Sequence, residues 1–170
     1  LHFKHVKNID FLCIDHNCLE ELDEDTFYEI SEVQHIRINN NHIKTLPNNL
    51  LKNLDKLYEL CLDYNKIKSI KPEVFNHAIN LLSLSLEGNQ LQEIHRDLFK
   101  SQKKISSLML NNNQISKLHP DIFTELPNLN SIHLKYNQLT EIDEKLFRNN
   151  ENIDKISLRG NKIKSVHPDA

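Results

Sequence analysis

Glycine is nearly absent from this chain, because Gly88 and Gly160 are the only two among 170 residues. That scarcity excludes a glycine-rich phosphate-binding loop, which needs several glycines close together. Long apolar runs are missing as well. No stretch approaches the roughly 18 residues of a membrane-spanning helix, and the first residues lack the apolar core of a signal peptide. The sequence therefore predicts no direct membrane insertion by this segment.

The net charge is small, since 21 Lys and Arg residues nearly balance 24 Asp and Glu residues to give −3. Such a chain has no overall field that attracts nucleic acid, so we expect no nucleic-acid partner. Signals for asparagine-linked glycosylation are also lacking, because no asparagine is followed two residues later by Ser or Thr. Their absence weakens an extracellular assignment.

What the chain does contain is an asparagine every 24 residues, at Asn17, Asn41, Asn65, Asn89, Asn113, Asn137 and Asn161. The same apolar frame, L-x-x-L-x-L-x-x-N-x-L-x-x-L, surrounds each of them. A fixed period of about 20–50 residues indicates one supersecondary unit stacked on copies of itself. The sequence thus predicts a single domain over residues 1–170, with repeats that start at 9, 33, 57, 81, 105, 129 and 153.

Within each repeat the L-x-L segment alternates apolar and variable residues with period two, which predicts a short strand. Neighbouring copies should lie parallel and about 4.8 Å apart. The wider return leg should curve the stack and leave the strands on its concave side. We interpret the repeated asparagine as structural, because its amide can bond the backbone of the sharp turn after each strand.

This pattern resembles the leucine-rich repeat family. The 24-residue length, with a phenylalanine ten residues after the asparagine in five repeats, is similar to the typical subclass. That subclass occurs in extracellular proteins such as Toll-like receptor ectodomains, Slit, chaoptin and secreted insect immune proteins. The resemblance implies an α/β solenoid, a right-handed curved horseshoe segment. It would carry a parallel β-ladder on the concave face and short helical or irregular turns on the convex face.

Some positions depart from the family pattern. Leu51 replaces the phenylalanine, and Gln102 and Asn150 stand where Leu or Ile is usual, so we expect looser turns there on the convex side. The Cys-rich capping modules of extracellular members are not visible. We therefore expect a piece of a longer ectodomain, or ends that partner chains cover, for example in a homo-oligomer.

The three cysteines leave the compartment open. Cys13 and Cys61 occupy the same outward strand position two repeats apart, a separation of about 10 Å that is too long for a disulfide. Cys18 lies in the turn beyond Asn17, away from Cys13. We expect free thiols, with Cys13 and Cys61 reachable by solvent. An intermolecular bridge is the alternative.

The candidate partner-binding residues are the outward-facing ones of the strand ladder, which do not build the core. They include tyrosine and methionine, two residue types found at binding surfaces. The predicted site comprises Arg37, Glu59, Asp63, Tyr64, Glu87, Met109, His133, Lys135, Tyr136 and Arg159.

A charge gradient runs along this surface. In the first four repeats four carboxylates, of which Asp15 is the first, oppose Arg37, and −4 + 1 gives −3. The last three repeats contribute +3 through Lys135, Lys155 and Arg159. Such a gradient would steer a dipolar partner or a second copy. The alternative is a solvated polar face with accidental asymmetry.

No metal, cofactor or catalytic site is predicted. His95, His119 and His167 each stand two residues before an aspartate. A zinc site needs three or four converging ligands, whereas these histidines are one or two repeats apart. No enclosed Ser/His/Asp or Cys/His set is visible either, so we do not expect an enzyme.

The sequence predicts a protein-binding recognition module of a secreted or cell-surface receptor, immune or adhesion protein. Two alternatives stay open: a structural protein that self-assembles, and an effector or scaffold that binds and inhibits a partner enzyme. An intracellular location also stays open. The sequence does not name the ligand, because one solenoid fold serves many ligands.

Overall fold

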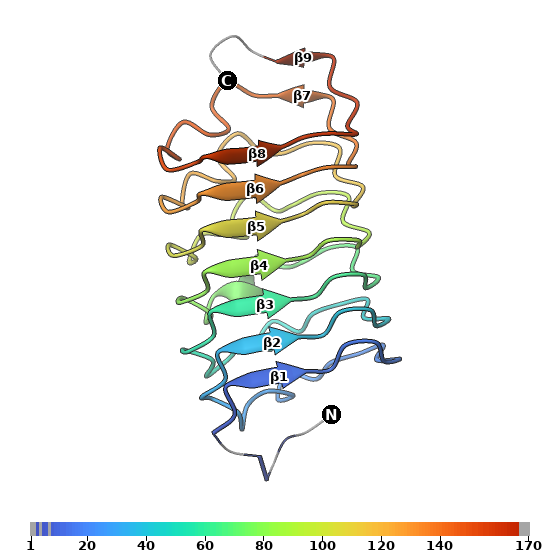
Figure 1. Cartoon of the computed structure of the whole chain (residues 1–170), viewed down its shortest axis with the longest axis vertical. Helices are drawn as coiled ribbons and strands as arrows, with labels where there is room; N and C mark the ends of the chain where they lie inside the picture. The colour runs from blue at the N-terminus through green and yellow to red at the C-terminus, as the bar shows by residue number, and fades with distance from the viewer. Residues whose placement is uncertain (1–2, 4, 7, 167–170) are drawn as a thin grey trace.

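The computed structural model describes residues 3, 5–6 and 8–166 and shows a solenoid of stacked coils (Figure 1). Its seven-stranded parallel sheet is ordered as in the chain: β1 Phe11–Cys13, β2 His35–Arg37, β3 Glu59–Cys61, β4 Ser83–Ser85, β5 Ser107–Met109, β6 Ser131–His133 and β8 Lys155–Ser157. Phe11 lies beside His35, and Ser131 lies beside Lys155, so the 24-residue period of the sequence is the register of the sheet. The predicted parallel solenoid is confirmed.

The return legs contain almost no helix. Within the described residues the 3-10 turn η1, Pro72–Phe75, is the one helical element, and a second small sheet pairs β7 Glu141–Ile142 with β9 Ser165–Val166. Proline suits the start of η1 because its missing N–H would have no partner there. Elsewhere the return legs run through turns closed by backbone hydrogen bonds between residues three apart. The helical part of the expected α/β architecture is thus reduced to a single turn.

Apolar side chains fill the interior of every coil. The middle residue of each of the first six ladder strands is buried. Phenylalanines of successive return legs stack, with ring centroids 6.4 Å apart for Phe99 and Phe123 and 5.7 Å apart for Phe123 and Phe147. Leu51 is fully buried in the same column, so the apolar stack continues where the phenylalanine is replaced.

The repeated asparagines connect neighbouring coils. Nδ2 of Asn89 donates to the carbonyl of Leu62 in the preceding coil (2.9 Å) and to that of Leu86 in its own (3.1 Å). Oδ1 of Asn89 accepts from the backbone N–H of Ile67 (3.1 Å). The same contacts recur at the buried residues Asn41, Asn65, Asn113 and Asn137. Each of these side chains also donates to the carbonyl two residues before it, so it bonds four backbone groups that the turn removes from water.

The turns at Gln102 and Asn150 are not loose, contrary to the expectation from the sequence. Both side chains are buried. The amide of Gln102 donates to the carbonyl of Phe75, and that of Asn150 donates to the carbonyls of Phe123 (2.9 Å) and Leu126 (2.8 Å). Here hydrogen bonds between return legs replace the apolar contact that Leu or Ile would make.

Candidate protein-binding surface

One surface of the solenoid is built from residues 11, 13, 15 and 16 of the first repeat and their equivalents every 24 residues. We call it the strand face. The side chains at the ends of each ladder strand point outward because successive residues of a strand face opposite sides. All ten residues of the predicted site lie on this surface, although several are occupied by contacts within the chain.

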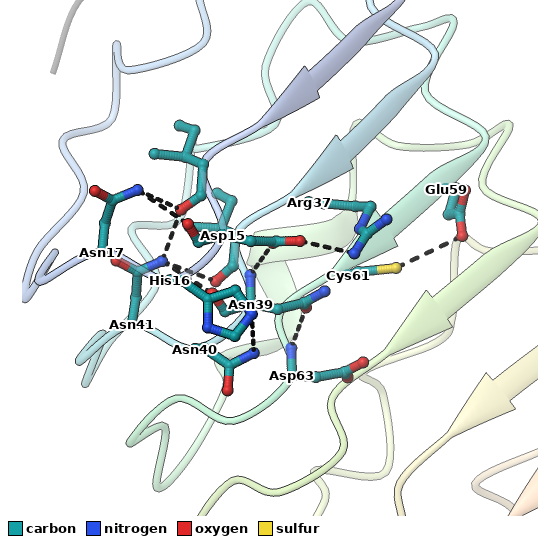
Figure 2. A network of polar contacts seen from close by, with 12 residues as sticks. Asp15, His16, Asn17, Arg37, Asn39, Asn40, Asn41, Glu59, Cys61 and Asp63 are labelled. Carbon is teal, nitrogen blue, oxygen red and sulfur yellow. Dashed lines mark hydrogen bonds and ion pairs between the residues drawn. The ribbon is translucent and has the colours of Figure 1, made fainter.

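Polar contacts within the chain occupy much of the strand face in the first three repeats (Figure 2). A guanidinium nitrogen of Arg37 donates to Asp15 Oδ2 (2.7 Å), and Asp15 Oδ1 accepts from the backbone N–H of Asn39 (2.6 Å). Oδ1 of Asn39 accepts in turn from the N–H of Asp63 (2.7 Å), and Asp63 accepts from the N–H of Glu87 (2.8 Å). These side chains form a second ladder between coils, parallel to the asparagine ladder.

The sequence interpretation missed this second ladder. Its signal was a short Asp or Asn side chain two residues before the repeated asparagine in four of the repeats, since Asn111 also accepts from the N–H of Lys135 (2.8 Å). Burial raises the pKa of Asp63, while hydrogen bonds from the Ser85 hydroxyl and the Glu87 N–H act in the opposite direction. The carboxylate of Asp63 is therefore engaged inside the chain.

Glu87 is the centre of a cluster in the middle of the strand face. Its Oε1 accepts from the hydroxyl of Tyr64 (3.0 Å) and from the side-chain amide of Asn112 (3.1 Å), and its Oε2 accepts from the amide of Asn111 (3.0 Å). The hydrogen bond to Glu87, and then burial, raise the pKa of Tyr64. The carboxylate of Glu87 is thus stabilised by three neutral hydrogen-bond donors of the same chain.

Cys61 is buried, so the expectation that solvent reaches it was wrong. Only 9% of the residue is exposed, because Arg37 and Ser85 flank it in the adjacent strands. Its Sγ donates to Oε1 of Glu59 (3.6 Å), and Oε2 of Glu59 lies 3.0 Å from Nδ1 of His35. Burial, then the neighbouring carboxylates, raise the pKa of Cys61 to about 12.

Thiol labelling should therefore separate the three cysteines. We expect a thiol-reactive dye to modify the exposed Cys13 and Cys18 promptly in the native protein. Cys61 should react only after unfolding, because it is buried and its raised pKa keeps the thiol protonated near neutral pH. Peptide mass spectrometry of protein labelled with and without denaturant measures this. Equal labelling of Cys61 and Cys13 in the native state would contradict the structure.

The basic end of the strand face, in the last two repeats, differs from the acidic end. Lys135, Lys155 and Arg159 form no ion pair with any residue that the structure describes. The guanidinium of Arg159 lies 6.0 Å from the centroid of the Tyr136 ring, within the range of a cation–π contact. Burial, then Lys155 and Lys135, lower the pKa of His133. Along the predicted charge gradient, the carboxylates at one end are thus hydrogen-bonded within the chain, whereas the three cations at the other end form no ion pair with the described residues.

Two tyrosines of the strand face each lie against a glycine of the next coil. Tyr64 and Tyr136 are 51% and 48% exposed, and both have a left-handed backbone with φ of 55°. A Cβ atom built on Gly88 would lie 2.4 Å from Cδ1 of Tyr64, and one on Gly160 would lie 2.4 Å from Cδ1 of Tyr136. The two glycines of the chain therefore stand where a side chain would displace a tyrosine ring. The signal in the sequence, a glycine 24 residues after each tyrosine, was not used.

The remaining candidates lie in other environments. Met109 is half-buried on β5 between Ser85 and His133 in the register of the sheet. On the return legs, Nδ1 of His95 and of His119 each accept a backbone N–H two residues later. His167 lies outside the described residues. Among those that are described, no group of three or more His, Cys, Asp or Glu side chains could hold a metal ion, and no helix is long and apolar enough to cross a bilayer.

Comparison with known proteins agrees with this architecture. A family model described as leucine rich repeat matches residues 31–91, 55–115, 79–139 and 127–170. The chain belongs to the leucine-rich repeat family. No curated protein sequence matches the chain.

Two solved structures show the leucine-rich repeat fold over nearly all of the chain. A crystal structure of a TLR13–ssRNA13 complex has a TM-score of 0.90 and 25% identity, with 94% of this chain and 23% of that one covered. The functional domain of InlJ from Listeria monocytogenes, which includes a cysteine ladder, has a TM-score of 0.76 and 21% identity, with 98% and 34% covered. This leucine-rich repeat chain thus spans between a fifth and about a third of their lengths.

Proposed function

We propose that this leucine-rich repeat chain is a protein-binding module of a secreted or cell-surface recognition protein, and that its partner lies on the strand face. The observation that carries the proposal is the pair of exposed tyrosines, Tyr64 and Tyr136. Each ring rests on a glycine of the next coil, so it is held in place before a partner arrives. Tyrosines fixed in this way are typical binding hot spots, because little conformational freedom is lost on binding.

The surroundings of the tyrosines support the same surface. Stacked repeats provide an extended binding surface whose outward residues vary while the core frame is kept. The ladder interior is filled and its asparagines are engaged with the backbone, whereas the strand face offers aromatic rings and unpaired cations. The TLR13 structure contains RNA, but in this near-neutral chain we propose a protein ligand. Self-association through the ends remains a second prediction.

Affinity capture with matched variants tests the proposal. Partners would be captured from an extract of the source organism with the wild-type chain, with Tyr64→Ser/Tyr136→Ser, and with Lys68→Ser/Lys117→Ser as a control on the return legs. We expect the strand-face variant to capture at least about tenfold less of the specific partner than the wild-type chain does, since each hot-spot tyrosine contributes about 1–2 kcal/mol or more to binding. The control should retain it. A partner captured equally by all three chains would overturn the proposal.

A further inference from the structure

The strand face contains two clusters of the same geometry and opposite charge. In one, Tyr64 lies on Gly88 and donates to Glu87, which precedes that glycine. In the other, Tyr136 lies on Gly160 and contacts Arg159, which precedes that glycine. The clusters are three repeats apart, about 14 Å along the ladder. Because the backbone arrangement is shared, the difference between them is the charge beside the ring and what satisfies it.

The acidic cluster is complete within the chain, whereas the basic one is not. Glu87 accepts three hydrogen bonds from side chains around it. Lys135 and Arg159 occupy equivalent positions in neighbouring coils, which places two like charges side by side on the same face, and Lys155 adds a third on β8. No carboxylate pairs with them among residues 8–166. Like charges held this close favour an anion from outside the chain.

We propose that the basic cluster of Lys135, Lys155 and Arg159 receives an acidic segment of the protein partner, with a side chain of that segment packed on the Tyr136 ring. This inference rests on the proposed function and names the chemistry of its ligand. Beside the cluster the strand face carries only small side chains. These are Ser107 on β5 and Ser131 on β6, whose hydroxyl oxygens lie 3.2 Å apart. An extended chain can lie there with its carboxylates toward the cations and one apolar or aromatic group on Tyr136.

A protein segment fits this surface better than a nucleic acid strand does. The three cations of the basic cluster lie in the last two repeats, Arg37 in the second repeat is paired with Asp15, and Glu87, Asp63 and Glu59 lie between them on the same face. A continuous polyanion that ran along the ladder would meet these carboxylates and be repelled. A short acidic segment with neutral or basic neighbours would not. The neighbouring Lys155 and Lys135 also lower the pKa of His133, which reflects the positive potential at this end.

Selection from a displayed library of random twelve-residue peptides tests this inference. The wild-type chain should enrich peptides that combine Asp or Glu with an apolar or aromatic residue. Enriched peptides, labelled and titrated by fluorescence anisotropy, should bind Lys135→Glu/Arg159→Glu at least tenfold more weakly. The control Lys68→Glu/Lys117→Glu changes the charge equally on the return legs and should bind like the wild type. Raising the salt from 0.05 to 0.5 M should weaken binding to the wild type, since exposed charges are screened.

Several results would overturn the inference. The first is recovery of neutral peptides or of no peptides. The second is binding that survives Lys135→Glu/Arg159→Glu in a variant whose melting temperature is unchanged. The third is a single-stranded oligouridylate that binds more tightly than an acidic peptide of equal charge. Testing Tyr64→Ser/Tyr136→Ser on the same peptides separates this inference from the proposed function. Neutral peptides that require the tyrosines would overturn only the acidic segment. Peptides that depend on neither set would count against the strand face itself.

Discussion

Replacing Asn89 by alanine is expected to lower the free energy of unfolding by about 3 kcal/mol, because it strands one buried backbone N–H and removes a hydrogen bond from each of two buried carbonyls. The N–H of Ile67 loses its partner, and the carbonyls of Leu62 and Leu86 each lose one of two donors, since the amides of Asn65 and Asn113 also reach them. For a chain of this size the melting temperature should fall by about 6–12 °C. Thermal and urea unfolding followed by circular dichroism measure the change.

Asn17→Ala is the matched control for this experiment. Asn17 is exposed, and among the described residues its amide donates to the carbonyls of Ile14 and Asp15 in its own turn and to no other coil. Its loss should cost less than about 1 kcal/mol. Partner affinity should be nearly unchanged in both variants when it is measured well below the melting range. Equal destabilisation by the two substitutions, or lost binding in a fully folded Asn89→Ala, would show that the asparagines have another role.

Gly88→Ala is expected to lower both stability and partner affinity. A left-handed alanine costs about 1–2 kcal/mol, at a φ of 68°. The new Cβ would also lie 2.4 Å from the Tyr64 ring. The ring must move, and its hydrogen bond to Glu87 breaks. We expect a loss of about 2–3 kcal/mol in unfolding free energy when the two effects are added, with partner affinity at least about tenfold weaker.

A double-mutant cycle isolates the contact between ring and glycine. Tyr64→Ser removes the ring, so adding Gly88→Ala in that background should cost only the backbone part. The two substitutions should therefore be non-additive by about 1 kcal/mol, as is usual for residues in contact. Strict additivity would mean that Tyr64 does not lie on Gly88.

The fold could be predicted from the sequence because its information is periodic. One motif repeated at a constant 24-residue interval determines the strands, their parallel order and their register, and the structure shows this ladder. The convex side was less predictable. Gln102 and Asn150 looked like defects in an apolar column, but each amide reaches a carbonyl of an earlier coil. Such contacts depend on where neighbouring coils place their carbonyls, which no single repeat encodes.

The surface was harder to predict for the same reason. The outward direction of Cys61 followed from its strand position, but its burial depends on Arg37 and Ser85 in the adjacent strands. The charge count made from the sequence treated Asp63 and Lys135 alike, each as one charge available to a partner. In the structure, however, the acid is engaged in a ladder, and the lysine side chain forms no ion pair within the described part of the chain. Residues that are 24 apart must be read together before their roles can be distinguished.

Blocking the strand face with a bulky group is the most direct test of the claim that it binds the partner. In a background with Cys13→Ser and Cys18→Ser, a cysteine introduced by Ser107→Cys on β5 would be coupled to a 5-kDa polyethylene glycol maleimide. The matched chain would carry the same group through Lys68→Cys on the return leg. Binding of the captured partner to each adduct would be measured by surface plasmon resonance.

We predict that the adduct at position 107 abolishes binding, while the adduct at position 68 leaves the affinity within about twofold of that of the unmodified chain, given the usual effect of changes outside the interface. Retained binding with position 107 blocked, together with loss at position 68, would contradict the account.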